Sequence, residues 1–158
     1  MERGSPREVK VVHPSDAEKQ VSDLSSRLLD MTQLRGEVTQ GGPAVSTGDD
    51  GKGRYSVHHY WSIWKLSPSE LEQGFQRLRE ELPKQGIRVT HYGPANSEAR
   101  QLEINAEDEK THSSVSVELL LRSLRPQDSP GASKEDLISF SVVSPVYRVP
   151  EGVDLNSF

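Results

Sequence analysis

Residues 54–71, RYSVHHYWSIWKLSPSEL, decide the fold, because they join a strand pattern directly to a helix start. Residues 54–66 are dense in aromatic and β-branched side chains, which is typical of strands. Alternation along a strand divides them between two faces. The face that better suits the core carries Tyr55, Val57, His59, Trp61 and Ile63. The opposite face carries Ser56, His58, Tyr60, Ser62 and Trp64.

Residues 67–70 predict the start of a helix. Ser67 is a favoured N-cap, Pro68 suits the first helical position, and Glu70 completes a capping box. Pro83 and Gly86 predict the end of this helix. The apolar stripe expected to face the core is Leu71, Phe75, Leu78 and Leu82.

A second helix is predicted earlier, over residues 16–32. Ser15 and Glu18 fit a capping box at its start. The apolar residues of this segment recur at spacings of three and four, which places them on one helix face. They are Ala17, Val21, Leu24, Leu28 and Met31. Residues 34–46 contain three glycines and a proline, so an interrupted strand at a sheet edge is expected there, followed by a turn-rich loop over 47–53.

The rest of the chain reads as strands joined mostly by short turns, which favours antiparallel pairing. The strand patterns cover residues 87–91, 102–104, 115–121, 138–142 and 146–149. The sequence therefore predicts an α+β fold with a mostly antiparallel sheet packed against two amphipathic helices. One domain over residues 15–150 lies between a flexible N-terminal tail, 1–14, and a C-terminal tail, 151–158. The short apolar patch at Val9, Val11 and Val12 leaves open that residues 1–14 form a loosely docked strand instead.

Composition restricts the partners. The chain of 158 residues carries a net charge of −5, and no block of Lys and Arg could neutralise phosphates, so nucleic acid is not an expected partner. No apolar run is long enough to span a bilayer. The absence of cysteine excludes disulfides and thiol chemistry. The sequence does not fix the oligomeric state.

No catalytic or metal site is predicted. His58 and His59 are adjacent on a strand and point to opposite faces, so they cannot chelate one ion together. A metal site would need one of them to meet His91 or His112, and no ligand spacing supports that. The paired carboxylates lie in expected loops or on an outer helix face, where nothing would desolvate them. No cofactor motif is present.

The strand over residues 54–66 carries the candidate binding residues: His58, Tyr60 and Trp64. An exposed aromatic surface of this kind suits a sugar, a peptide or a partner protein. The simpler expectation is that Trp64 packs under the N-terminal helix or a long loop.

The order of elements resembles that of small, mostly uncharacterised secreted lipoproteins of actinobacteria. The resemblance covers roughly residues 16–150 and rests on four segments: LSSRLLD at 24–30, SPSELEQGFQRLR at 67–79, GIRVTHY at 86–92 and SVVSPVYRVP at 141–150. It implies a membrane-tethered domain outside the cytoplasm, but no catalytic residue. Many of those proteins carry a cysteine pair, and Ser144 stands here where a cysteine would be expected.

The leading hypothesis is a non-enzymatic extracytoplasmic binding domain of lipoprotein type, which binds an unidentified protein or small ligand. It would reach a membrane only through a tether that precedes this chain. One alternative is a soluble cytoplasmic partner-binding module. Another is a small hydrolase or isomerase with a histidine and a carboxylate in a sheet cavity. A buried His–carboxylate pair in a concave pocket would favour the enzyme, and a flat exposed aromatic patch the binding module.

Overall fold

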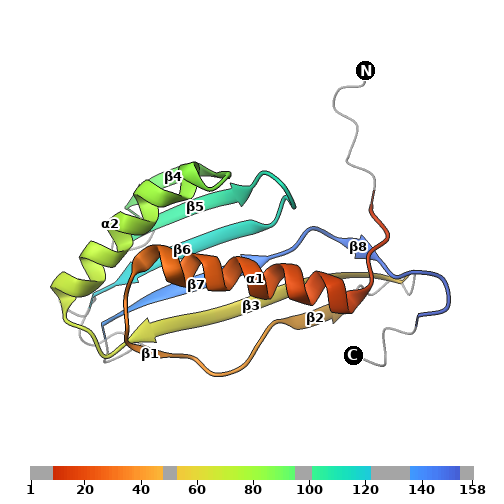
Figure 1. Cartoon of the computed structure of the whole chain (residues 1–158), viewed down its shortest axis with the longest axis horizontal. Helices are drawn as coiled ribbons and strands as arrows, with labels where there is room; N and C mark the ends of the chain where they lie inside the picture. Colours follow the sequence, from red (N-terminus) through yellow and green to blue (C-terminus); the bar gives the residue numbers. More distant parts are fainter. Residues whose placement is uncertain (1–8, 48–52, 95–100, 122–135, 154–158) are drawn as a thin grey trace, which may run out of the picture.

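The computed structural model describes residues 9–47, 53–94, 101–121 and 136–153. Within these ranges, two helices pack on one face of an antiparallel sheet (Figure 1). The helices are α1 (Pro14–Thr32) and α2 (Pro68–Lys84). The strands are β1 (Glu37–Val38), β2 (Ala44–Thr47), β3 (Arg54–Trp64), β4 (Ile87–Pro94), β5 (Leu102–Asp108), β6 (Ser114–Leu120), β7 (Leu137–Val143) and β8 (Tyr147–Arg148). The predicted α+β class is therefore confirmed.

The strand order is β1-β3-β7-β6-β5-β4, and β2 and β8 also pair with β3. Every strand pair is antiparallel. β4, β5 and β6 form the expected meander, but β7 lies between β6 and β3 and connects the meander to the rest of the sheet. The interrupted strand predicted over residues 34–46 appears as β1 and β2, separated at Gly41, whose φ is +111°.

The core lies between the helices and the sheet face that they cover. The predicted stripes of both helices are buried. From β3, this core takes Tyr55, Val57, Trp61 and Ile63, as the alternation predicted. The Trp61 ring stacks on Phe140 of β7, with 3.9 Å between centroids.

Trp64 lies on the opposite face and is partly exposed. The expectation that it packs under the N-terminal helix was wrong, because alternation on β3 turns its side chain away from α1.

α2 begins as predicted. The Ser67 side chain accepts a hydrogen bond from the Glu70 N–H at 3.1 Å, and the Glu70 carboxylate accepts one from the Ser67 N–H at 3.0 Å. Hydrogen bonding with Ser67 lowers the pKa of Glu70. The predicted end of α2 at Pro83 and Gly86 is confirmed: the last helical residue is Lys84, and Gly86 follows the C-cap with a φ of +77°. Leu82, immediately before this proline, is fully buried, and its packing holds the last turn in place.

α1 begins two residues earlier than predicted. The N-cap is His13, whose Nδ1 accepts a hydrogen bond from the Ser15 N–H at 3.1 Å, and Pro14 occupies the first turn. Proline suits this position because its φ is already helical. Ser15 and Glu18 therefore do not form the predicted capping box.

At the N-terminal end, the described residues dock on the sheet, as the second expectation for this segment had it. Val11 bridges to Arg148 of β8, and the Val12 carbonyl accepts a hydrogen bond from the Tyr55 hydroxyl. Burial raises the pKa of Tyr55 to about 12. Residues 9–14 are thus part of the fold. The predicted loop at 47–53 lies largely outside the described residues.

Candidate functional site

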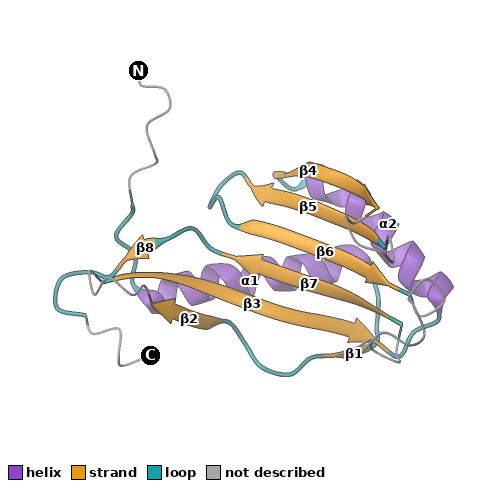
Figure 2. Ribbon diagram, turned by 180° about the vertical axis from the view of Figure 1, so that it is seen from behind, coloured by secondary structure: helices purple, strands orange, loops and turns teal. Residues whose placement is uncertain are grey.

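Figure 2 shows the sheet face that faces away from both helices. We call it the open face. The register places its outward side chains in rows across the strands. One row is Tyr60, Ser141, Ser116 and Asn105. The next row is Ser62, Ser139, Glu118 and Glu103. The open face therefore presents mainly hydroxyl, amide and carboxylate groups.

Tyr60 is the most prominent aromatic side chain of the open face. It is 62% exposed. The His58 ring stacks on it with 5.0 Å between centroids, and Ser46 Oγ of β2 lies 2.9 Å from His58 Nδ1. This chain of contacts holds the Tyr60 ring in place before any ligand arrives, which reduces the entropy lost on binding.

The structure separates the third predicted site residue from the other two. Trp64 lies four residues beyond Tyr60 on β3, about 13 Å along the strand. Its cross-strand neighbour is Leu137, which in turn pairs with Leu120 of β6. Of the predicted set, the structure brings His58 and Tyr60 together, whereas Trp64 belongs to an apolar corner of the same face.

A hollow of about 390 Å³ adjoins the Tyr60 row on the open face. Its polar lining includes Asn105, Ser116, Ser141, Glu107 and Ser114. Sequence reasoning missed these residues. The available signal was the alternation of serine with apolar residues in SVSV at 114–117 and ISFS at 138–141, which predicts a hydroxyl-lined outer face.

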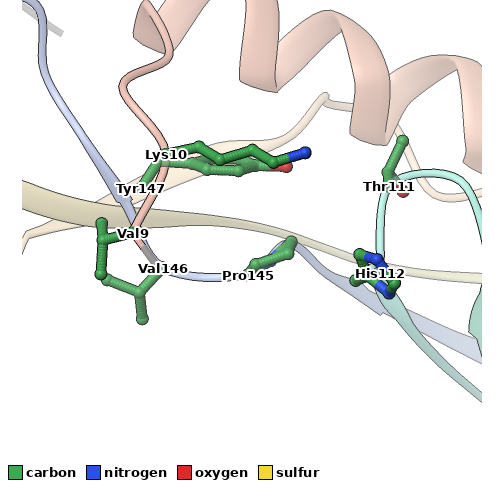
Figure 3. Close-up of a pocket in the computed structure, with 7 residues that line it drawn as sticks. All are labelled: Val9, Lys10, Thr111, His112, Pro145, Val146 and Tyr147. Carbon is green, nitrogen blue, oxygen red and sulfur yellow. The ribbon is translucent and has the colours of Figure 1, made fainter. Parts of the chain in front are cut away.

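A larger hollow, of about 630 Å³, lies at one end of the sheet. Figure 3 shows its lining, with His112 on one side, Val9 and Val146 on the other, and Pro145 between them. His112 Nδ1 lies 2.9 Å from Glu107 Oε2, and the two side chains are 35% and 27% exposed. A His–carboxylate pair is thus present, but it is not buried.

The remaining histidines have separate neighbours. His91 Nε2 lies 3.6 Å from Glu103 Oε1 at the β4–β5 edge of the open face. His59 points to the helix side, where its Nδ1 lies 2.8 Å from Ser25 Oγ. Within the described ranges, no three His, Asp or Glu side chains are placed to hold one metal ion.

Ser144, where the resemblance implied a cysteine, has a structural role. It is buried, and its Oγ accepts a hydrogen bond from the Val57 N–H at 2.8 Å. The Ser144 N–H donates to the Val57 carbonyl at 2.8 Å. Ser144 therefore extends the pairing of β7 with β3 by one residue.

Neither described helix is both long and apolar enough to cross a membrane. Comparison of the chain with protein-family models, curated proteins and solved structures gives no match.

Proposed function

We propose that this protein is a non-enzymatic binding domain whose open face holds a neutral, polyhydroxylated ligand of the saccharide class. The observation that carries the proposal is the row from the exposed Tyr60 through Ser141 and Ser116 to Asn105. An aromatic ring offers a flat apolar surface for the C–H face of a sugar. Hydroxyl, amide and carboxylate groups can each pair with sugar hydroxyls.

The chemistry of the open face favours this ligand over others. A phosphate-rich ligand would meet a chain of net charge −5 and a row containing Glu118 and Glu103. A stable protein partner would be expected to bury a more apolar centre, whereas the apolar side chains here lie mainly in the Trp64 corner. The row crosses four strands, which span about 14 Å, so an oligosaccharide fits better than a single sugar.

Calorimetric titration with maltohexaose, cellohexaose and chitohexaose tests the proposal. At least one should bind, and Tyr60→Ala should weaken that binding about 10-fold, since it removes the stacking surface. Glu118→Gln should weaken it about 3- to 10-fold. Its matched control is Glu80→Gln on the exposed side of α2. No binding by the three sugars, or equal effects of the two glutamine variants, would contradict the proposal.

The tethered location stays part of the proposal. The resemblance to secreted lipoproteins supports it, and durable attachment would require a lipidated cysteine upstream together with a second membrane signal. The native gene should then encode a signal peptide and that cysteine before this segment. A native reading frame that starts at Met1, with the untagged protein in the cytosolic fraction, would favour the cytoplasmic binding module instead.

A second candidate function rests on the His112–Glu107 pair beside the larger hollow. A histidine held by a carboxylate can act as a general base in hydrolysis or isomerisation. A hydrolase should turn over p-nitrophenyl acetate, and His112→Gln should abolish that turnover. Equal rates with His112→Gln would exclude this pair as the site of such hydrolysis.

A further inference from the structure

The end of the sheet where the N-terminal segment joins β8 gathers exposed apolar side chains (Figure 1). The Val12 N–H donates to the Arg148 carbonyl at 3.0 Å, which holds this segment alongside β8. Val11 bridges to Arg148 and is 57% exposed. Val146, two residues before Arg148, is 52% exposed. Of the large hydrophobic side chains in the described ranges, the only other exposed one is Tyr60, so the exposed aliphatic surface is concentrated at this end.

Two arginines lie directly opposite each other at the same end of the sheet. Arg54 of β3 and Arg148 of β8 are cross-strand partners, and both are exposed. Their neighbours Tyr55 and Tyr147 are buried, so alternation points both arginines away from the core. Among the described residues, no carboxylate forms an ion pair with either guanidinium. Like charges directly opposite each other destabilise a sheet, and an anionic partner would offset this repulsion.

The exposed valines and the two arginines face the same way. Val11 lies on the same side of the sheet as its bridge partner Arg148. Figure 3 shows Val9 and Val146 side by side, both pointing away from the Tyr147 ring. The result is one surface with apolar and cationic parts, which we call the valine–arginine patch: Val9, Val11, Arg54, Val146 and Arg148.

We propose that the valine–arginine patch docks on the surface of a bilayer that contains anionic phospholipid. The two guanidiniums pair with headgroup phosphates, and the valines lie at the boundary between headgroups and acyl chains. A soluble anion would leave the exposed valines in water, whereas a bilayer matches both parts of the patch. Arg54 lies six residues from Tyr60 on β3, about 20 Å along the strand, so the patch does not overlap the row that begins at Tyr60.

The expected affinity of the patch alone is low. A basic side chain close to an anionic surface strengthens binding about 5-fold, so the two arginines together contribute about 30-fold. The net charge of −5 opposes this attraction, so only this end of the chain should approach the bilayer. Durable attachment rests on the tether proposed above, which would reach the domain at Val9, within the patch. The patch then supplies the second signal that a single lipid chain requires.

Sedimentation of the 158-residue chain with vesicles tests the patch without any tether. The chain should bind phosphatidylcholine vesicles that contain about one third phosphatidylglycerol, and should bind phosphatidylcholine alone at least about 10-fold more weakly. Raising the salt from about 0.05 M to about 0.5 M should weaken binding to the anionic vesicles, because salt screens exposed charges. Arg148→Gln and Arg54→Gln should each weaken it about 5-fold. The matched control is Arg35→Gln, which removes the same charge from an exposed site after α1.

A spin-labelled lipid in the same vesicles locates the contact. It should broaden the methyl signals of Val11 and Val146 and leave the ring signals of Tyr60 sharp. The proposal is overturned if the anionic vesicles do not bind the chain, if the Arg148→Gln and Arg35→Gln variants bind equally, or if Tyr60 is broadened instead of the valines. Release from the vesicles by inorganic phosphate at the same ionic strength would indicate a site for a soluble anion and would also overturn it. The saccharide titrations use no vesicles, so failure of either proposal is seen separately.

Discussion

The two faces of the sheet come from the same strands but have opposite chemistry. On β7, Phe140 is fully buried against Trp61, whereas its neighbour Ser141 points to the open face. On β3, Tyr55 is 1% exposed and Tyr60 is 62% exposed. Stability therefore depends mainly on the covered face, and the open face is available for binding. Substitutions of neighbouring residues should separate the two roles.

The largest difference is expected between Phe140→Ala and Ser141→Ala. Phe140→Ala removes a fully buried ring stacked on Trp61 and should cost about 3–5 kcal/mol of unfolding free energy. Ser141→Ala changes an outward hydroxyl and should stay within about 0.5 kcal/mol of the parent chain. Urea denaturation measures both values. Equal losses of unfolding free energy would mean that side chains of the open face also stabilise the fold.

Gly74→Ala should destabilise the covered side although alanine favours helices. A Cβ at Gly74 would lie 2.4 Å from Leu34 Cδ1, so the partly buried Leu34 side chain would have to move, or α2 and the segment after α1 would have to separate. We expect a net cost of about 1–3 kcal/mol from overpacking, even after the gain of about 1 kcal/mol in helix propensity. Adding Leu34→Ala should recover part of that loss. A more stable Gly74→Ala would show that this contact is loose.

Ser67→Ala should cost about 1 kcal/mol, because it removes the side-chain acceptor for the Glu70 N–H. Ser69→Ala, two residues later in the same turn, is the control and should have little effect on the same denaturation curve. If both changes lower the free energy of unfolding equally, the hydrogen bond from the Glu70 N–H to Ser67 does not itself stabilise the fold.

The smallest effect concerns pH. Burial lowers the pKa of His59 in the folded chain, so below about pH 6.5 the unfolded chain binds more protons than the folded one. Stability from this group is present above pH 6.5 and is lost as the pH falls through the folded pKa. The melting temperature should thus fall less steeply between pH 7 and pH 5 in His59→Gln than in the parent chain. Parallel curves would contradict the lowered pKa.

Short-range sequence patterns predicted most of the helices and strands that form the helix-covered face of the sheet. Alternation in β3, the capping box at Ser67 and the apolar stripes of both helices act over a few residues and can be read directly. The start of α1 was missed because His13 is an unusual N-cap, and the local signal at Ser15 pointed elsewhere. The end of α2 was predicted from Pro83 and Gly86, because both residues also act locally.

The candidate sites were harder to predict because they depend on strand order. His58 and Tyr60 lie two residues apart, so alternation alone places them together. Ser141 and Ser116 join Tyr60 only because β7 is inserted between β3 and β6. The contact between Ser25 and His59 joins residues 34 positions apart in the sequence. No local pattern encodes such long-range pairings.

Tyr55 and Tyr60 of β3 lie on opposite faces of the sheet and therefore report directly on whether the saccharide binds to the open face. Both rings can be followed by aromatic ¹H–¹³C spectra during titration with the hexasaccharide that binds most tightly. If the open face binds the sugar, the Tyr60 ring signals should shift saturably, while those of Tyr55 remain unchanged. Shifts at Tyr55 with none at Tyr60, or binding that moves neither ring, would contradict it.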